Sequence, residues 1–172
     1  MSIFIEELKK SDAVDLLEFE LRNRVFFEET VPARGDEYYI PEIFNKRLDA
    51  LLEEQLQGIS RFYLIKDKEH SIVGRINVVD YEENLKSCHL GYRIGEKHTG
   101  KGMASKALAL LVESHLDPNI EIIQAKTTTN NIASQKVLEK NGFEKVVTTG
   151  EPFAFNGQKA NFIYYTWTKE QQ

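Results

Sequence analysis

Gly91-Tyr-Arg-Ile-Gly-Glu-Lys-His-Thr-Gly-Lys-Gly-Met-Ala104 is the most informative part of the sequence. A strand-like segment, residues 87–94, runs into a turn rich in glycine and lysine, and a helix-like segment from residue 103 to about residue 116 follows at once. Backbone N–H groups at a helix N-terminus lack intrahelical partners and lie at the positive end of the helix dipole. Because glycines let a phosphate come close to that backbone, the turn predicts a site for a phosphate-bearing ligand.

Two kinds of phosphate ligand fit this turn. Gly95-x-x-x-x-Gly100-Lys101-Gly102 comes within one residue of the nucleoside-triphosphate loop G-x-x-x-x-G-K-[ST]. That loop needs a hydroxyl group after the lysine to bind magnesium, and Gly102 has no side chain to supply one. The next strand-like run, residues 121–126, contains no aspartate for a second metal contact. A nucleotide triphosphatase is therefore disfavoured.

The second possible ligand follows from a family resemblance. Lys97-His98-Thr99-Gly100-Lys101-Gly102 resembles the pyrophosphate loop, [QR]-x-x-G-x-[GA], of the GNAT superfamily of acetyl-CoA-dependent N-acetyltransferases. Lys97 stands where the family usually has Gln or Arg. This is a mild substitution, because the family binds the pyrophosphate mainly through the backbone of the loop.

A later segment strengthens the resemblance. Asn131-Ile-Ala-Ser134, followed by Val137-Leu-Glu-Lys-Asn-Gly-Phe143, resembles the N-x-x-S-x-x-[VL]-x-x-x-x-G-F signature of the RimJ/RimL-type branch. The spacing predicts a helix that Asn130 or Asn131 caps and that ends at Gly142. The apolar positions expected to face inward are Ala133, Val137 and Leu138.

The resemblance implies a coenzyme site made of both segments. The pyrophosphate would bind the amides of residues 98–104, and the thioester carbonyl would meet a backbone N–H in residues 92–94. In the family, the equivalents of Asn131 and Ser134 lie beside coenzyme A, and the serine can protonate the leaving thiolate. The predicted coenzyme-binding residues are Tyr92, Arg93, Ile94, Lys97, His98, Thr99, Gly100, Lys101, Gly102, Met103, Ala104, Asn131 and Ser134.

Acetyl transfer to an amine also needs a general base, which must reach the amine directly or through one water molecule. Glu151 falls between the last two predicted strands, where some relatives of this branch carry a catalytic glutamate. Glu28 and Glu29 follow the first predicted helix, in a region that lines the acceptor cleft in the family. For each, the alternative is an ordinary solvated carboxylate. The predicted catalytic residues are Ser134, Glu151 and Glu28, with Glu29 as a further candidate.

Length and composition agree with a single domain over residues 1–172, which the resemblance implies is an N-acetyltransferase domain. The chain has 172 residues, of which 41% are hydrophobic, so it can bury a substantial core without being divided. The N-terminal residues carry acid early and contain no long apolar run, so neither a signal peptide nor a membrane span is expected. One cysteine, Cys88, allows no internal disulfide and no zinc cluster. A cytoplasmic protein without a metal is expected.

The acceptor is less well defined. The formal net charge of −5 disfavours a general nucleic-acid binder and would suit a substrate that bears a cationic amine. Residues 23–34 resemble the cleft-lining region of the protein-directed members, which favours the N-terminal amine of a protein, possibly a ribosomal one. A small-molecule amine or antibiotic stays open as the acceptor, and so does a non-catalytic module that binds acyl-CoA. We expect a monomer or a homodimer.

Periodicity alone predicts a mixed α/β or α+β fold. Strands are expected at residues 3–5, 61–66, 72–79, 87–94, 121–126, about 143–148 and 161–168. A first helix is expected from Ser11 or Asp12 to about Phe27, with Val14, Leu17, Leu21 and Val25 on one face. A second should begin at Pro41 and end near Gly58, with a stripe of Phe44, Leu48, Leu51 and Leu52. This order is that of the GNAT fold, and the resemblance implies a mostly antiparallel sheet, splayed between its fourth and fifth strands and flanked by helices.

Overall fold

The computed structural model describes residues 2–146, 152–155 and 157–172. At its centre is a seven-stranded sheet with the order β1-β2-β3-β4-β5-β9-β6. These strands are β1 (Ile3–Glu7), β2 (Arg61–Asp67), β3 (Ile72–Glu82), β4 (Ser87–Ile94), β5 (Ile122–Thr128), β6 (Glu144–Val146) and β9 (Phe162–Thr168). Two more strands, β7 (Phe153–Phe155) and β8 (Gln158–Ala160), form a separate hairpin that the sequence did not predict.

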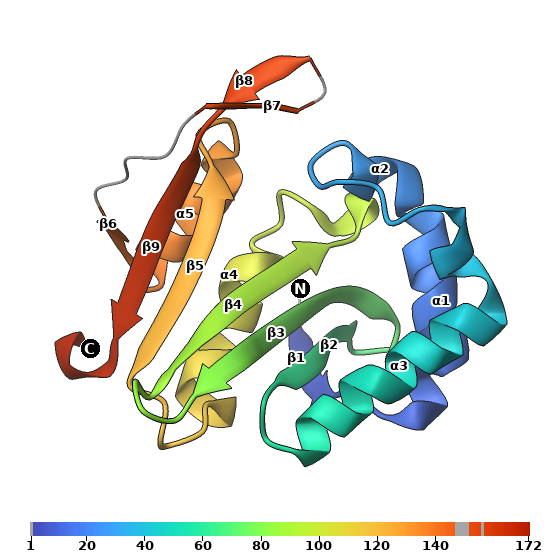
Figure 1. Cartoon of the computed structure of the whole chain (residues 1–172), viewed down its shortest axis with the longest axis horizontal. Coiled ribbons are helices and arrows are strands. Elements are labelled where there is room, and N and C mark those ends of the chain that lie inside the picture. Colours follow the sequence, from blue (N-terminus) through green and yellow to red (C-terminus); the bar gives the residue numbers. More distant parts are fainter. Residues whose placement is uncertain (1, 147–151, 156) are drawn as a thin grey trace.

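The strand pairing divides the sheet into two arms. Strands β1 to β4 pair antiparallel in sequence order, and β9 lies antiparallel between β5 and β6. Strands β4 and β5 join the arms in parallel, but only from Ser87 opposite Ile122 to His89 opposite Gln124. Beyond His89 the two strands diverge (Figure 1). The predicted GNAT fold, with its sheet splayed between the fourth and fifth strands, is confirmed.

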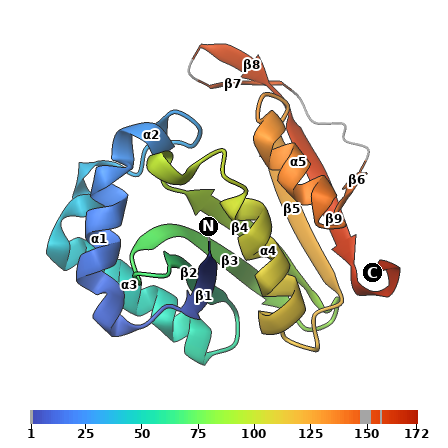
Figure 2. The ribbon, with the colours of Figure 1, turned by 180° about the vertical axis from the view of Figure 1, so that it is seen from behind.

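Helices cover both faces of the sheet. The helices are α1 (Ala13–Arg22), α2 (Arg24–Glu28), α3 (Pro41–Leu56), α4 (Met103–Leu110), which continues as the π-helical turn η4 (Leu111–His115), and α5 (Ile132–Lys140). Short 3-10 turns are η1 (Lys10–Asp12), η2 (Asp36–Tyr39), η3 (Glu96–His98) and η5 (Lys169–Gln171). The sheet has a hydrophobic core on each face, and β2 contributes to both because its successive side chains point to opposite faces. Phe62 and Leu64 pack with α1 and α3, whereas Tyr63 and Ile65 pack with α4. Figure 2 shows α4 and α5 lying across the sheet.

The prediction of the first helix was wrong in two respects. It is interrupted at Asn23, whose Nδ2 donates to the Phe19 carbonyl at 2.9 Å and whose Oδ1 accepts from the Glu96 amide at 2.9 Å. The predicted apolar face is also wrong, since Val14 and Val25 are both 77% exposed. The face that is buried instead consists of Leu16, Phe19, Glu20, Asn23 and Phe27. Because Glu20 and Asn23 are polar, the apolar residues of this face do not recur at the helical spacing that would have predicted it.

The other helices follow their predictions more closely. Helix α3 begins at Pro41 and buries Phe44 and Leu48, as expected. Asn131 caps α5, because its side chain accepts a hydrogen bond from the Ser134 amide at 3.1 Å. Leu138 is buried as predicted, whereas Ala133 is exposed. Among the helices of the described residues, none is both long enough and apolar enough to cross a membrane.

Candidate active site

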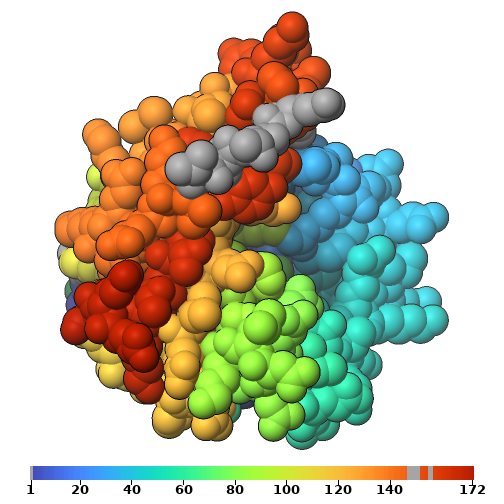
Figure 3. All heavy atoms as spheres, turned by 60° about the vertical axis from the view of Figure 1, so that its left-hand side comes forward, coloured from blue at the N-terminus to red at the C-terminus, as the bar shows by residue number. Residues whose placement is uncertain are grey.

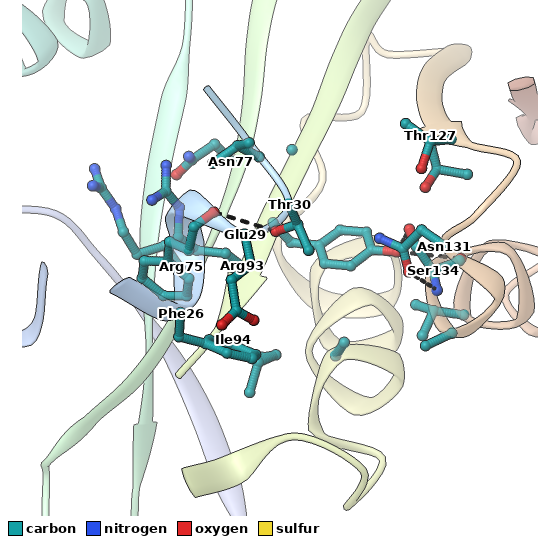
Figure 4. A pocket seen from close by; sticks show the side chains of 18 of the residues that line it. Phe26, Glu29, Thr30, Arg75, Asn77, Arg93, Ile94, Thr127, Asn131 and Ser134 are labelled. Carbon is teal, nitrogen blue, oxygen red and sulfur yellow. Dashed lines mark hydrogen bonds between the residues drawn. The ribbon is translucent and has the colours of Figure 1, made fainter. Parts of the chain in front are cut away.

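A cleft of about 1590 Å³ opens where β4 and β5 diverge. Its walls come from segments far apart in the chain: α2 and the residues that follow it, α3, the turn before α4, the start of α5, and the β7–β8 hairpin. Figure 3 shows a hollow between the blue N-terminal helices and the orange-to-red C-terminal strands. In Figure 4, Arg75, Asn77 and Arg93 lie on one side of the pocket, across from Thr127, Asn131 and Ser134.

The turn before α4 is an open cradle of backbone amides. Gly100 and Gly102 have φ angles of 72° and 75°, a left-handed conformation that favours glycine. A Cβ atom built on either glycine would meet nothing within 4 Å, so a ligand can come close to the backbone. Gly102 is the N-cap of α4, and the amides of the first helical turn have no intrahelical acceptor. These amides can bind an anion such as a diphosphate.

The edge of β4 that faces β5 supplies further backbone groups. In the described part of the chain, no residue of β5 pairs with β4 beyond His89. The backbone of residues 90–94 therefore faces the gap on one side while it pairs with β3 on the other. An extended ligand with amide groups can hydrogen-bond to such an edge much as an added strand would.

Two hydroxyl groups meet across the gap. The hydroxyl of Tyr92, on β4, lies 2.8 Å from Oγ of Ser134, on α5. Burial raises the pKa of Tyr92, so its phenol is protonated at neutral pH and can donate to Ser134. Ser134 is held in turn by Asn131, which accepts a hydrogen bond from its amide. The pair places a proton donor inside the cleft.

The cleft brings together most of the predicted coenzyme-binding residues. Those that line it are Tyr92, Arg93, Ile94, His98, Thr99, Gly100, Gly102, Met103, Ala104, Asn131 and Ser134. Lys97 and Lys101 are exposed and lie outside the lining. Nδ1 of His98 is buried without a hydrogen-bond partner among the described residues. Burial, followed by the charge of Lys101, lowers the pKa of His98 and favours its neutral form.

The predicted acidic residues lie in different surroundings. Glu28 accepts a hydrogen bond from Arg24 Nε at 3.0 Å and is not part of the cleft lining. Glu29, the next residue, does line the cleft. Glu151 falls outside the described residues, so its role stays a prediction from the sequence.

Two polar residues of β3 that line the cleft were not predicted from the sequence. Arg75 and Asn77 line the cleft, and Arg75 donates to the buried carboxylate of Glu20 at 2.6 Å. Both residues alternate with the buried Ile76 and Val78. Charged or amide side chains at alternate positions of an otherwise apolar strand are the signal that could have indicated them.

A splayed sheet with an amide cradle at one end of the gap and a proton donor within it defines an acyltransferase that uses an acyl-CoA thioester. The chain belongs to the Acetyltransferase (GNAT) domain family, which it matches over residues 3–144. It is therefore an acetyltransferase, and acetyl-CoA is its acetyl donor. The open backbone at Gly100 and Gly102 and the unpaired edge of β4 fit that ligand.

Named relatives agree with this assignment and with the predicted RimJ/RimL-type resemblance. The [Ribosomal protein uS5]-alanine N-acetyltransferase of Escherichia coli (strain K12) is 30% identical over 151 residues, which cover 86% of this chain and 77% of the relative. The probable N-acetyltransferase YjcK of Bacillus subtilis (strain 168) is 27% identical over 160 residues, covering 91% and 88% of the two chains. The crystal structure of ribosomal-protein-S5-alanine acetyltransferase from Vibrio fischeri shares the fold, with a TM-score of 0.85, 24% identity and coverage of 100% and 96%.

Proposed function

We propose that this acetyltransferase acts on the N-terminal amino group of a protein. The similarity to the Escherichia coli uS5-alanine enzyme over 86% of the chain is the observation that carries the proposal. The cleft supports it, because it is walled by the α2 region on one side and by the β7–β8 hairpin on the other. A peptide terminus can enter between two such walls in an extended form.

The amides of residues 100–104 are proposed to hold the pyrophosphate of acetyl-CoA, which supplies the acetyl thioester. The edge of β4 binds the pantetheine arm. A backbone N–H of residues 92–94 points at the thioester carbonyl oxygen and stabilises the negative charge that develops there when the amine attacks. Holding the two reactants side by side is the larger part of the catalysis, because it makes a bimolecular step effectively unimolecular.

Two proton transfers complete the proposed mechanism. Glu29 accepts the proton of the acceptor ammonium, directly or through one water molecule, since it is the acidic residue of this region that lines the cleft. Ser134 donates the proton that the leaving thiolate takes up, and it recovers one from the Tyr92 hydroxyl, 2.8 Å away. The attacking nitrogen sheds its second proton to solvent as the amide forms, and solvent in the cleft returns a proton to Tyr92. Glu151 and Glu28 remain alternatives for the base, as predicted from the sequence.

A comparison of acceptors tests the proposal. The chain is incubated with acetyl-CoA and one of three amines: a peptide with a free N-terminal alanine and no lysine, the same peptide with a blocked N-terminus and one added lysine, and a small polyamine. Mass spectrometry should find one acetyl group on the free N-terminus and little on the other two acceptors. Acetylation of the polyamine alone would support a small-molecule acceptor instead. Binding of acetyl-CoA without any transfer would favour a non-catalytic module.

A further inference from the structure

The face of the sheet next to α1 carries a group of charges around one buried acid. The carboxylate of Glu20 is 0% exposed and accepts hydrogen bonds from Arg75 Nη1 at 2.6 Å and from Arg93 Nη1 at 3.3 Å. Arg34 Nη1 lies 3.9 Å from the same carboxylate. We call Arg34, Arg75 and Arg93 the arginine cluster. Because three guanidinium groups face one carboxylate, the group has a formal excess of two positive charges.

The arginine cluster makes the cleft basic. All three of its members line the cleft. The other described lining residues with a full formal charge are the cationic Arg47 and Lys126 and the acidic Glu29. The cleft lining is therefore positively charged, although the whole chain has a formal net charge of −5. That net charge had suggested a cationic substrate. Net charge describes the whole surface and does not predict the charge of one cleft.

Two members of the cluster are partly exposed and held in place by aromatic rings. The side chains of Arg93 and Arg34 are 24% and 30% exposed. The guanidinium carbon of Arg93 lies 4.8 Å from the centre of the Phe27 ring, and that of Arg34 lies 4.5 Å from the centre of the Tyr38 ring. Such stacking fixes the planar group while its N–H donors stay available for a carboxylate. The cluster is thus preorganised for an anion.

The cluster does not face the amide cradle that fits the coenzyme. Neighbouring side chains of a strand point to opposite faces, and Tyr92 packs with the core on the α4 side. Arg93 therefore points toward α1, where it meets Glu20. Arg75 pairs directly with Arg93 across the β3–β4 ladder, so the cluster lies on the α1 side of the sheet.

Asn77 lies next to the cluster on the same face of β3. Its side-chain oxygen is buried and has no hydrogen-bond partner among the described residues. It is opposite Gly91 in the ladder, where a Cβ atom would meet nothing within 4 Å, so there is space beside it. A buried amide oxygen without a partner is costly, and an ammonium or amide N–H would satisfy it. Asn77 can thus orient an incoming amine.

We propose that the acceptor is a peptide whose N-terminal amine lies at Asn77 and whose second or third residue is acidic. Its carboxylate binds Arg93 and Arg34. Asn77 and Arg75 are two residues apart on β3, about 7 Å, which is also the reach of two residues of an extended peptide. This inference rests on the proposed acetylation of a protein N-terminus and names the class of terminus that is preferred.

Matched peptides test the inference. One begins Ala-Asp-Asp and the other Ala-Asn-Asn, each followed by the same neutral tail, and kcat/KM is measured for both. The intact chain should prefer the acidic peptide by about tenfold or more, the range expected of a charge-assisted contact. The preference should fall to about twofold or less in Arg93→Gln and in Arg34→Gln, and added salt should weaken it. Arg22→Gln is the control, because Arg22 is outside the cleft lining and its Nη2 lies 3.2 Å from the Glu18 carboxylate. This variant should keep the preference for the acidic peptide.

Acetyl-CoA affinity, measured by calorimetry on every variant, separates a loss of acceptor binding from a loss of folding. Arg93→Lys keeps the charge and should keep part of the preference. Equal kcat/KM for the two peptides, or a preference for the neutral one, would overturn the inference and leave the proposed function standing. If neither peptide is acetylated, the proposed function fails, and this inference fails with it.

Discussion

At the scale of single residues, the contact between Tyr92 and Ser134 joins the two arms of the splayed sheet. The two hydroxyl oxygens are 2.8 Å apart, although the residues are far apart in the sequence and belong to β4 and α5. The sequence predicted that Ser134 lies beside the coenzyme, but it gave no sign that Tyr92 is its partner. A contact between two separate motifs depends on how the arms are placed, which local sequence does not specify.

Replacing Ser134 by alanine should slow the chemistry more than it weakens binding. Loss of a proton donor to the leaving thiolate is expected to lower kcat by about a hundredfold. The KM for acetyl-CoA should change little, because backbone groups provide most of the binding. Tyr92→Phe keeps the ring and removes the hydroxyl, so it should lower kcat by a smaller factor. Steady-state kinetics measure kcat and the KM for acetyl-CoA in both variants. An equal effect on kcat and on affinity would show that Ser134 only binds the coenzyme.

The adjacent acids Glu28 and Glu29 form a natural comparison. Glu29→Gln should lower kcat/KM by about a hundredfold, because the proposed base is removed. Glu28→Gln should have little effect, since its carboxylate is paired with Arg24 outside the cleft. Steady-state kinetics with one peptide acceptor give kcat/KM for both variants. Full activity of Glu29→Gln would move the role of base to another group, with Glu151→Gln as the next variant to measure.

At the scale of elements, α1 shows why part of the site escaped prediction. Its buried face includes Glu20, which holds the arginine cluster, and Asn23, which ties the end of the helix to the turn after β4. Polar residues that are buried for function interrupt the apolar period by which a buried face is recognised. The glycine-rich turn and the α5 segment could be predicted because each is a contiguous motif with a local physical cause.

Glu20→Gln tests the structural part of this arrangement. Removing one partner of a buried ion pair leaves uncompensated charge on Arg75, so the free energy of unfolding should fall by about 3 kcal/mol. Glu18→Gln is the matched control, because Glu18 forms an exposed pair with Arg22 on the same helix. It should change stability by about 0.5 kcal/mol or less. Urea unfolding of both variants gives the comparison, and equal stabilities would show that the buried pair contributes nothing.

The cap of α5 couples stability to the site. Asn131→Ala removes the acceptor for the Ser134 amide, at a cost of about 1 kcal/mol in the free energy of unfolding. Because this hydrogen bond also positions Ser134, kcat should fall as well. Asn119→Ala, at an exposed position away from the cleft, should change neither quantity. A loss of stability without any loss of kcat would contradict the positioning role.

At the scale of the whole molecule, the site exists because the two arms of the sheet meet at only a few residues. The half that we propose for the coenzyme comes mainly from β4, the turn that follows it and α5, and most of its residues were predicted from the sequence. The half that we propose for the acceptor combines α1, α2, β3 and the β7–β8 hairpin. Its residues carry no shared local motif, and their proximity follows from the topology alone.

A calorimetric titration of the chain with acetyl-CoA tests the coenzyme site at the turn before α4, with Gly100→Asp and Gly58→Asp measured beside it. Both glycines have left-handed φ angles, 72° and 74°, and open space around a built Cβ, so the two variants carry equal backbone strain and charge. Gly58 follows α3 and lies outside the cleft lining. We predict micromolar binding, about −8 kcal/mol, for the intact chain and for Gly58→Asp, and none for Gly100→Asp. Unchanged affinity in a folded Gly100→Asp variant would contradict the assignment of the coenzyme to this turn.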